Sequence, residues 1–220
     1  MNKHYYLVID TETTGTLEKP IIYDLGGAII DRYGNVYETF SFVIKEMWHD
    51  NWEMLRSAHY AEKLPNYQKE LILGIRELVT YYQAKQHIEN LCEKYNVKAI
   101  MAHNAAFDYR ATRNTQKFLT DGKYSTFLPY EIEIWDTMKM ARDVIATKKS
   151  YIKFCQENDY MTNHTPSRVK VTAEVLYRFI SGDNEFIEKH TGLEDVLIEK
   201  EIFAYCVKQH KAMRRNLFEK

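Results

Sequence analysis

The chain has 220 residues, of which 45% are hydrophobic and 14% aromatic, enough for one large domain with a real core. A formal net charge of −1 excludes the global basic signature of a nucleic-acid coat or packaging protein, so any polyanion would have to be held locally. Three distant cysteines without a C-x-x-C pair argue for reduced thiols in a cytosolic setting and against a disulfide framework. The lack of a signal-peptide core and of any run of about 18 apolar residues predicts a soluble, cytoplasmic protein without a membrane partner.

The first element is a short apolar run over residues 6–9 that ends in two carboxylates, Asp10 and Glu12. Its β-branched, aromatic and aliphatic residues predict a buried strand. Because side chains alternate along a strand, we expect both acids to point the same way, with Thr11 and Thr13 opposite. Two like charges aimed at one spot are tolerable around a divalent cation, and such oxygen ligands suit Mg²⁺ or Mn²⁺. The alternative is a solvated strand end with two surface acids.

The following residues predict a three-strand antiparallel meander whose first strand carries the acids. The second strand covers residues 24–31, and a Gly-Asn turn at 33–36 leads into a third strand over 37–45. Residues 46–74 then mix aromatic side chains with charges, which we interpret as a variable, lid-like region of short helices and loops. Its aromatic residues are candidates for stacking on bases or for anchoring the region to the core: Trp48, Trp52 and Tyr60.

Strands and helices alternate in the remainder of the chain, which predicts an α/β fold with a mixed sheet flanked by helices. The first expected segments are an amphipathic helix over 75–95, a strand over 97–102, and a helix capped by Asn104 with Asp108 in its first turn. A strand over 132–135 and a helix from 136 to about 145 follow. The chain then continues with a polar loop over 160–170, a helix over 171–180 and a long C-terminal helix with Asp195 in its first turn.

Three motifs in this order resemble those of the DEDDh 3′→5′ exonucleases, a family that includes the proofreading epsilon subunit of bacterial DNA polymerase III, ribonuclease T and oligoribonuclease. The motifs are Asp10-Thr-Glu12-Thr-Thr-Gly, Ala102-His103-Asn104-Ala-Ala-Phe107-Asp108, and His190 followed five residues later by Asp195; Asp136-Thr137 resembles the Asp-Thr that commonly follows the second motif. The resemblance implies a ribonuclease H-like fold and a single exonuclease domain over residues 1–220. It also marks residues 160–184 as an insertion.

The resemblance further implies phosphodiester hydrolysis with two ions, Mg²⁺ or Mn²⁺, about 4 Å apart. Asp10, Glu12 and Asp195 would hold the ion on the side of the nucleophile. Asp10 would bridge to the second ion, and Asp108 would support that ion directly or through water. His190, with an ordinary pKa of about 6.5, would be the general base that deprotonates the attacking water.

Residues near the motifs are candidates for binding the end of the substrate. Thr13 would bond the terminal sugar, and Phe107 would stack against the last bases or belong to the core. Asn104 is a further substrate-binding candidate, with helix capping as the alternative. Several basic residues either line a phosphate path or form a solvated face: Lys139, Arg142, Lys148, Lys149, Arg168 and Lys170.

The leading hypothesis is a 3′→5′ exonuclease that removes nucleoside monophosphates from single-stranded DNA, in replication, proofreading or repair. Its partner would be a single-stranded nucleic acid with a free 3′ end, DNA in preference to RNA, and a DNA polymerase is a further candidate partner. An exoribonuclease of the same family is one alternative, because the motifs specify the cleavage chemistry and not the sugar. A non-catalytic nucleic-acid-binding or polymerase-associated module is another, although four clustered carboxylates without metal would be costly there.

Overall fold

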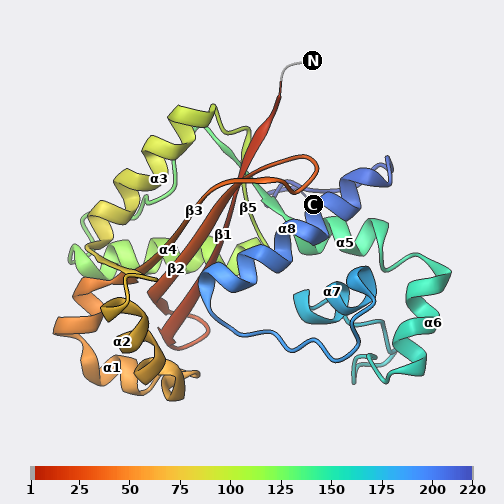
Figure 1. Ribbon diagram of the computed structural model, residues 1–220, viewed down its shortest axis with the longest axis horizontal. Coiled ribbons are helices and arrows are strands. Elements are labelled where there is room, and N and C mark those ends of the chain that lie inside the picture. Colours follow the sequence, from red (N-terminus) through yellow and green to blue (C-terminus); the bar gives the residue numbers. More distant parts are fainter. Residues whose placement is uncertain (1–2, 220) are drawn as a thin grey trace.

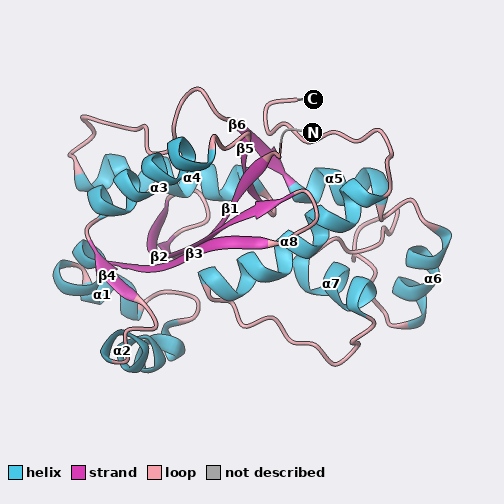
Figure 2. Ribbon diagram, turned by 45° about the horizontal axis from the view of Figure 1, so that its top comes forward, coloured by secondary structure: helices cyan, strands magenta, loops and turns pink. Residues whose placement is uncertain are grey.

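A computed structural model describes residues 3–219 and contains a six-stranded mixed sheet in the order β4-β3-β2-β1-β5-β6 (Figures 1 and 2). The antiparallel meander and the parallel strands that follow it confirm the predicted mixed sheet, and β1 is longer than the predicted run because it continues through the acids. The strands are β1 (Tyr5–Gly15), β2 (Pro20–Asp31), β3 (Val36–Ile44), β4 (Glu77–Val79), β5 (Ala99–Ala102) and β6 (Glu133–Asp136).

Helices cover both faces of the sheet, as Figure 1 shows, with α3 and α4 on one side and α5, α7 and α8 on the other. Alternating residues of β1 belong to the two cores: Leu7 and Ile9 pack toward α3 and α4, and Tyr6 and Val8 toward α8. The helices are α1 (Trp52–Arg56), α2 (Leu64–Ile72), α3 (Tyr81–Tyr95), α4 (Ala105–Leu119), α5 (Thr137–Val144), α6 (Lys149–Glu157), α7 (Ala173–Ser181) and α8 (Gly192–Lys208), with a π-helical turn η1 (Glu46–Asp50) and a 3₁₀ turn η2 (Ala61–Lys63).

The predicted helix over 75–95 is wrong in its first turns. Thr80 caps α3 in a reciprocal capping box with Gln83, so the helix cannot begin earlier. The residues before Thr80 form the short strand β4, which pairs in parallel with β3 at the edge of the sheet. The apolar residues three and four positions apart that predicted one helix therefore belong, in part, to a strand that precedes the helix.

The predicted cap of α4 is also wrong. Asn104 occupies the N-cap position, but it has a left-handed backbone (φ 68°) and its side chain makes no capping hydrogen bond. Its backbone N–H instead donates to Asp136 Oδ1 at 3.1 Å, and the same oxygen accepts from the backbone N–H of Met138 at the start of α5. Asp136 therefore ties the ends of β5 and β6 together.

Residues 46–74 form four short helical segments, as predicted, at one end of the sheet. Trp48 packs against the core and contacts Trp52 edge-to-face, so the anchoring interpretation holds for Trp48, whereas Trp52 is 40% exposed. Whether the region acts as a lid stays a prediction, as does the interpretation of 160–184 as an insertion. Within residues 3–219, no helix combines the length and apolar character that crossing a bilayer requires.

Candidate active site

A cleft of about 430 Å³ lies at the ends of β1 and β5, bounded by α4, α7 and α8. All five residues that the sequence analysis placed at the catalytic centre line it: Asp10, Glu12, Asp108, His190 and Asp195. They come from β1, the first turns of α4 and α8, and the loop before α8. The sheet thus brings motifs that are far apart in the sequence to one cavity.

Two glycines allow the start of α8 to lie directly on the sheet. A Cβ atom on Gly26 of β2 would be 2.1 Å from the Gly192 carbonyl carbon, and a Cβ on Gly192 would be 2.5 Å from the Gly26 nitrogen. Gly26 is also the cross-strand partner of Asp10. Any side chain at either glycine would push the first turn of α8, which carries Asp195, away from the strand that carries Asp10.

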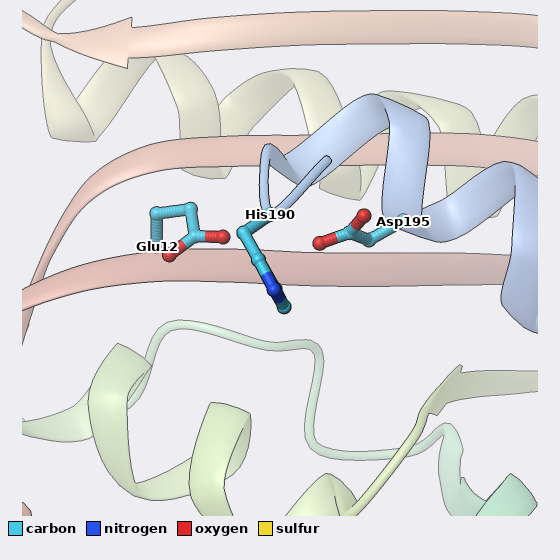
Figure 3. Close-up of side chains that lie close together, drawn as sticks. All are labelled: Glu12, His190 and Asp195. Carbon is cyan, nitrogen blue, oxygen red and sulfur yellow. The ribbon is translucent and has the colours of Figure 1, made fainter. Parts of the chain in front are cut away.

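One group of potential metal ligands in the cleft consists of Glu12, His190 and Asp195. One ligand atom from each lies within 4.8 Å of the other two. Figure 3 shows the carboxylates of Glu12 and Asp195 on either side of the His190 side chain. Carboxylate oxygens and an imidazole nitrogen in this arrangement suit a hard or intermediate divalent cation.

The carboxylates of the cleft repel one another when they are ionised. Burial, with repulsion from neighbouring carboxylates, raises the pKa of Glu12 to about 9 and that of Asp195 to about 8. Burial raises the pKa of Asp108 to about 7, although the Thr11 hydroxyl opposes the rise. The pKa of Asp10 is raised well above its ordinary range by burial and by four nearby acids. Full ionisation of this group at neutral pH therefore requires cations.

Asp108 reaches the cleft from the opposite face of the sheet. It lies in the first turn of α4, and Thr11 donates a hydrogen bond of 2.7 Å to its Oδ1. The predicted alternation along β1 explains the arrangement, because the acids face α8 while Thr11 faces α4. The register between β1 and β2 shifts after Glu12, and Thr13 is not among the residues that line the cleft, so its contact with a sugar stays a prediction.

His190 is held by residues from the 46–74 region. Its ring stacks on Tyr60 at a centroid distance of 4.6 Å and an interplanar angle of 9°. Lys63 donates to the His190 carbonyl oxygen at 3.2 Å, and it also bonds the Lys189 carbonyl and lies over the Tyr60 ring. These contacts fix a histidine whose own backbone is left-handed (φ 52°).

The pKa of His190 is lowered from its ordinary value, first by burial and then by the charge of Lys63. Its Nδ1 lies 3.8 Å from Glu188 Oε2, which is too long for a hydrogen bond. A lowered pKa leaves the imidazole neutral at physiological pH. The ring is therefore in the state in which a histidine accepts a proton.

Thr137, which follows Asp136 in the Asp-Thr pair of the sequence, contacts His103 of the second motif. His103 is half-buried between two hydrogen-bond partners: its Nε2 donates to the Val171 carbonyl oxygen at 2.7 Å, and its Nδ1 lies 2.9 Å from the Thr137 hydroxyl. Burial lowers the pKa of His103. This histidine joins the end of β5 to α5 and to the segment before α7, and it lines the cleft.

Among the remaining candidates, Asn104, Phe107 and Lys170 line the cleft. Lys139 instead donates to carbonyl oxygens near the C-terminus, and Lys148 bonds the side chains of Tyr205 and Gln209. The other three basic residues are not among the residues that line the cleft: Arg142, Lys149 and Arg168.

Three residues of the site were missed by the sequence analysis: Lys63, Glu188 and Glu199. Glu188 and Glu199 line the cleft, and Glu199 lies one helical turn after Asp195 on α8. That i, i+4 spacing was a usable signal, because it places both acids on one face of the helix. Lys63 lies far from the motifs in sequence, and nothing local indicates its contact with the His190 segment.

No protein-family model and no curated protein matches the chain in sequence. Solved structures of exonuclease I do match the fold. The E. coli enzyme in complex with a 5cy-dT13 oligonucleotide is 17% identical with a TM-score of 0.56, over 93% of this chain and 42% of that one. Its zinc-bound form with single-stranded DNA is 15% identical with a TM-score of 0.54, over 95% and 41% of the two chains.

A moderately thermophilic exonuclease I from Methylocaldum szegediense gives a similar result, with 15% identity, a TM-score of 0.52 and coverage of 94% of this chain and 41% of that one. The chain thus spans less than half the length of these exonuclease I structures. At these identities the likeness concerns the fold. The ribonuclease H-like mixed sheet predicted from the motifs is confirmed, and the chain resembles exonucleases in structure as well as in sequence motifs.

Proposed function

We propose that the chain is a divalent-metal-dependent 3′→5′ exonuclease that hydrolyses single-stranded DNA to nucleoside monophosphates. The observation that carries the proposal is the convergence of Asp10, Glu12, Asp108, Asp195 and His190 in one open cleft. Exonuclease I, whose fold the chain shares, is described in complex with single-stranded DNA and oligonucleotides. That likeness supports single-stranded DNA as the substrate.

The donor set of the cleft fits divalent cations. Its carboxylates are hard oxygen ligands, their mutual repulsion requires positive charge, and Asp195 Oδ1 is buried without a hydrogen-bond partner among the described residues. Asp10, Glu12 and Asp195 would hold one ion, and Asp10 and Asp108 the second. When bound, such ions activate water and stabilise the charge of the leaving 3′-oxygen.

The neutral His190 would accept the proton of the attacking water. Its ring lies beside Glu12 and Asp195, and its stacking on Tyr60 limits the orientations it can adopt. A positioned general base contributes about 10²–10⁴-fold to the rate. The exposed side of the cleft offers Phe107, Asn104 and Lys170 to the terminal nucleotide and its phosphate.

The test uses matched DNA and RNA oligonucleotides labelled at either end, with Mg²⁺ or Mn²⁺ and with EDTA. We expect mononucleotides from the 3′ end of single-stranded DNA, slower digestion of blunt duplex, and little cleavage of circular or 3′-phosphorylated strands. Fraying a terminus costs about 1–2 kcal/mol per base-pair step, or about tenfold in rate. His190→Ala should lower turnover by about 10²–10⁴-fold while metal binding is retained.

Other outcomes separate the alternatives. Faster digestion of RNA would indicate an exoribonuclease, and equal cleavage of circular and linear strands would indicate an endonuclease on the same fold. DNA binding without hydrolysis under any metal would indicate a non-catalytic module. Full activity in exhaustively chelated protein would refute the metal-dependent mechanism.

A further inference from the structure

Glu199 is a buried carboxylate that the proposed mechanism does not use. It lies on α8 one turn after Asp195, is 2% exposed and lines the cleft. Among the described residues, its Oε2 atom has no hydrogen-bond partner and the side chain forms no ion pair. Glutamates are almost never buried this deeply unless their charge is paired.

The charges that most disfavour the ionisation of Glu199 belong to other acids. Asp108 and Asp195 disfavour its ionisation, and Glu199 is in turn the charge that most disfavours the ionisation of Asp10. The backbone N–H of His103 provides a partial counterweight. Glu199 therefore lies near Asp10 and Asp108 in the cleft that all three line.

A structural role for this residue would call for a partner on each oxygen, because an unsatisfied buried oxygen costs about 1–3 kcal/mol. The chain instead leaves this oxygen without a partner on a side chain that lines a cavity with five other acids. A divalent cation would satisfy that oxygen and offset the repulsion among the acids at the same time. The second ion of the proposed mechanism also has the smaller set of protein ligands, Asp10 and Asp108.

We propose that Glu199 is a fifth acidic ligand of the divalent-metal site, on the side of Asp10 and Asp108. The inference rests on the proposed function, because it assumes that the cleft binds metal. It adds a ligand on α8 to an ion that the two shared motifs would otherwise hold with Asp10 and Asp108 alone.

The test is a Mn²⁺ titration of the metal-free protein by calorimetry and by electron paramagnetic resonance. Glu199→Gln keeps the size of the side chain and removes its charge. Glu201→Gln makes the same change two residues along α8, on a partly exposed side chain that pairs with Lys200 and does not line the cleft. We expect Glu199→Gln to lower the affinity for one of the two Mn²⁺ ions by about tenfold or more, or to abolish its binding. Glu201→Gln should bind Mn²⁺ as the wild type does. In EDTA, Glu199→Gln should unfold at an equal or higher temperature.

A Glu199→Asp variant, which keeps the charge on a shorter side chain, should bind Mn²⁺ more tightly than Glu199→Gln and provides a second measurement if Glu199→Gln does not fold. Mn²⁺ affinity and stoichiometry of Glu199→Gln within about twofold of the wild type would overturn the inference. A wild-type protein that binds no Mn²⁺ would refute the proposed function itself. Wild-type binding and hydrolysis with an unaffected Glu199→Gln would refute only the role of Glu199.

Discussion

Glu12 and Asp24 are cross-strand neighbours on β1 and β2, yet their carboxylates have opposite surroundings. Asp24 is fully buried and accepts hydrogen bonds from Tyr67 at 2.6 Å and from the Gly192 N–H at 2.9 Å. Arg76 lies 3.1 Å away as its ion-pair partner. Burial raises the pKa of Asp24, but each of these three partners opposes the rise.

Arg76 extends this network to the start of α8. Its guanidinium also contacts Glu70 of α2 and, at 3.2 Å, Glu194, whose own carboxylate bonds Thr191. The network therefore joins β2, α2 and the N-terminus of α8 through one buried cation. It holds in place the turn that carries Asp195.

Glu12, by contrast, lies among acids, and Lys63 is the cation whose charge lowers its pKa. The two carboxylates are neighbours on one sheet and are buried to similar degrees, at 9% and 0% exposure. Only Asp24 has a full set of protein partners. The difference shows that the fold satisfies the acid that positions α8 and leaves Glu12 without such partners, as the proposed binding of a cation in the cleft would require.

Removal of an acid from the cleft should give the largest effect of the variants considered. It should lower the hydrolysis rate without lowering the stability of the fold. Asp10→Asn should lower the hydrolysis rate by about 10³-fold or more, because it removes the ligand shared by both ions. In EDTA its unfolding temperature should equal or exceed that of the wild type, because repulsion from the neighbouring acids is reduced. Asp121→Asn, on an exposed loop, is the control for both assays. A large loss of stability would mean that Asp10 is structural.

Removal of the buried cation from the Asp24 network should give the opposite pattern. Arg76→Met should cost about 3–5 kcal/mol in the free energy of unfolding, because it leaves Asp24 buried without its ion-pair partner. Arg56→Met removes an exposed pair with Glu53 and should change stability by less than about 1 kcal/mol. Denaturant unfolding in EDTA measures both variants. A cost for Arg76→Met as small as that of the control would show that the network does not hold the fold.

The pH dependence of stability should distinguish the two groups of acids without mutation. Glu12, Asp108 and Asp195 have pKa values of about 9, about 7 and about 8 in the fold, against about 4 in an unfolded chain. Between about pH 4 and pH 9 the folded protein therefore binds more protons than the unfolded chain, and its stability falls as pH rises. We expect a loss of at least about 2 kcal/mol over this range in EDTA.

Excess Mg²⁺ should flatten that dependence, because bound cations favour the ionised acids. Denaturant unfolding at several pH values, with EDTA or Mg²⁺, measures both curves. Glu12→Gln should reduce the slope in EDTA. Identical slopes with and without metal would contradict the assignment of the cleft acids as metal ligands.

The sequence was enough to predict the sheet and to predict that the five candidate catalytic residues lie together, because each of the four acids among them follows a strong local signal. Asp10 and Glu12 end an apolar run, and Asp108 and Asp195 open helices, so topology alone brings them together. The contacts of Arg76 and Lys63 could not be predicted in this way. Both side chains reach partners more than 50 residues away, and their own surroundings in sequence carry no pattern.

The smallest expected effect concerns Tyr60, which stacks on His190 from the 46–74 region. Aromatic pairs contribute about 0.5–1.5 kcal/mol beyond buried area, so Tyr60→Ala should lower kcat by about threefold to tenfold. Tyr60→Phe keeps the flat ring and should retain activity, and Tyr82→Ala, a change at a tyrosine that is 65% exposed, is the control. Because burial is the first cause of the lowered pKa of His190, Tyr60→Ala should also raise that pKa toward about 6.5 in an NMR titration. If Tyr60 instead stacks on the substrate, KM should rise with little change in kcat, and the pKa of His190 should stay where it is.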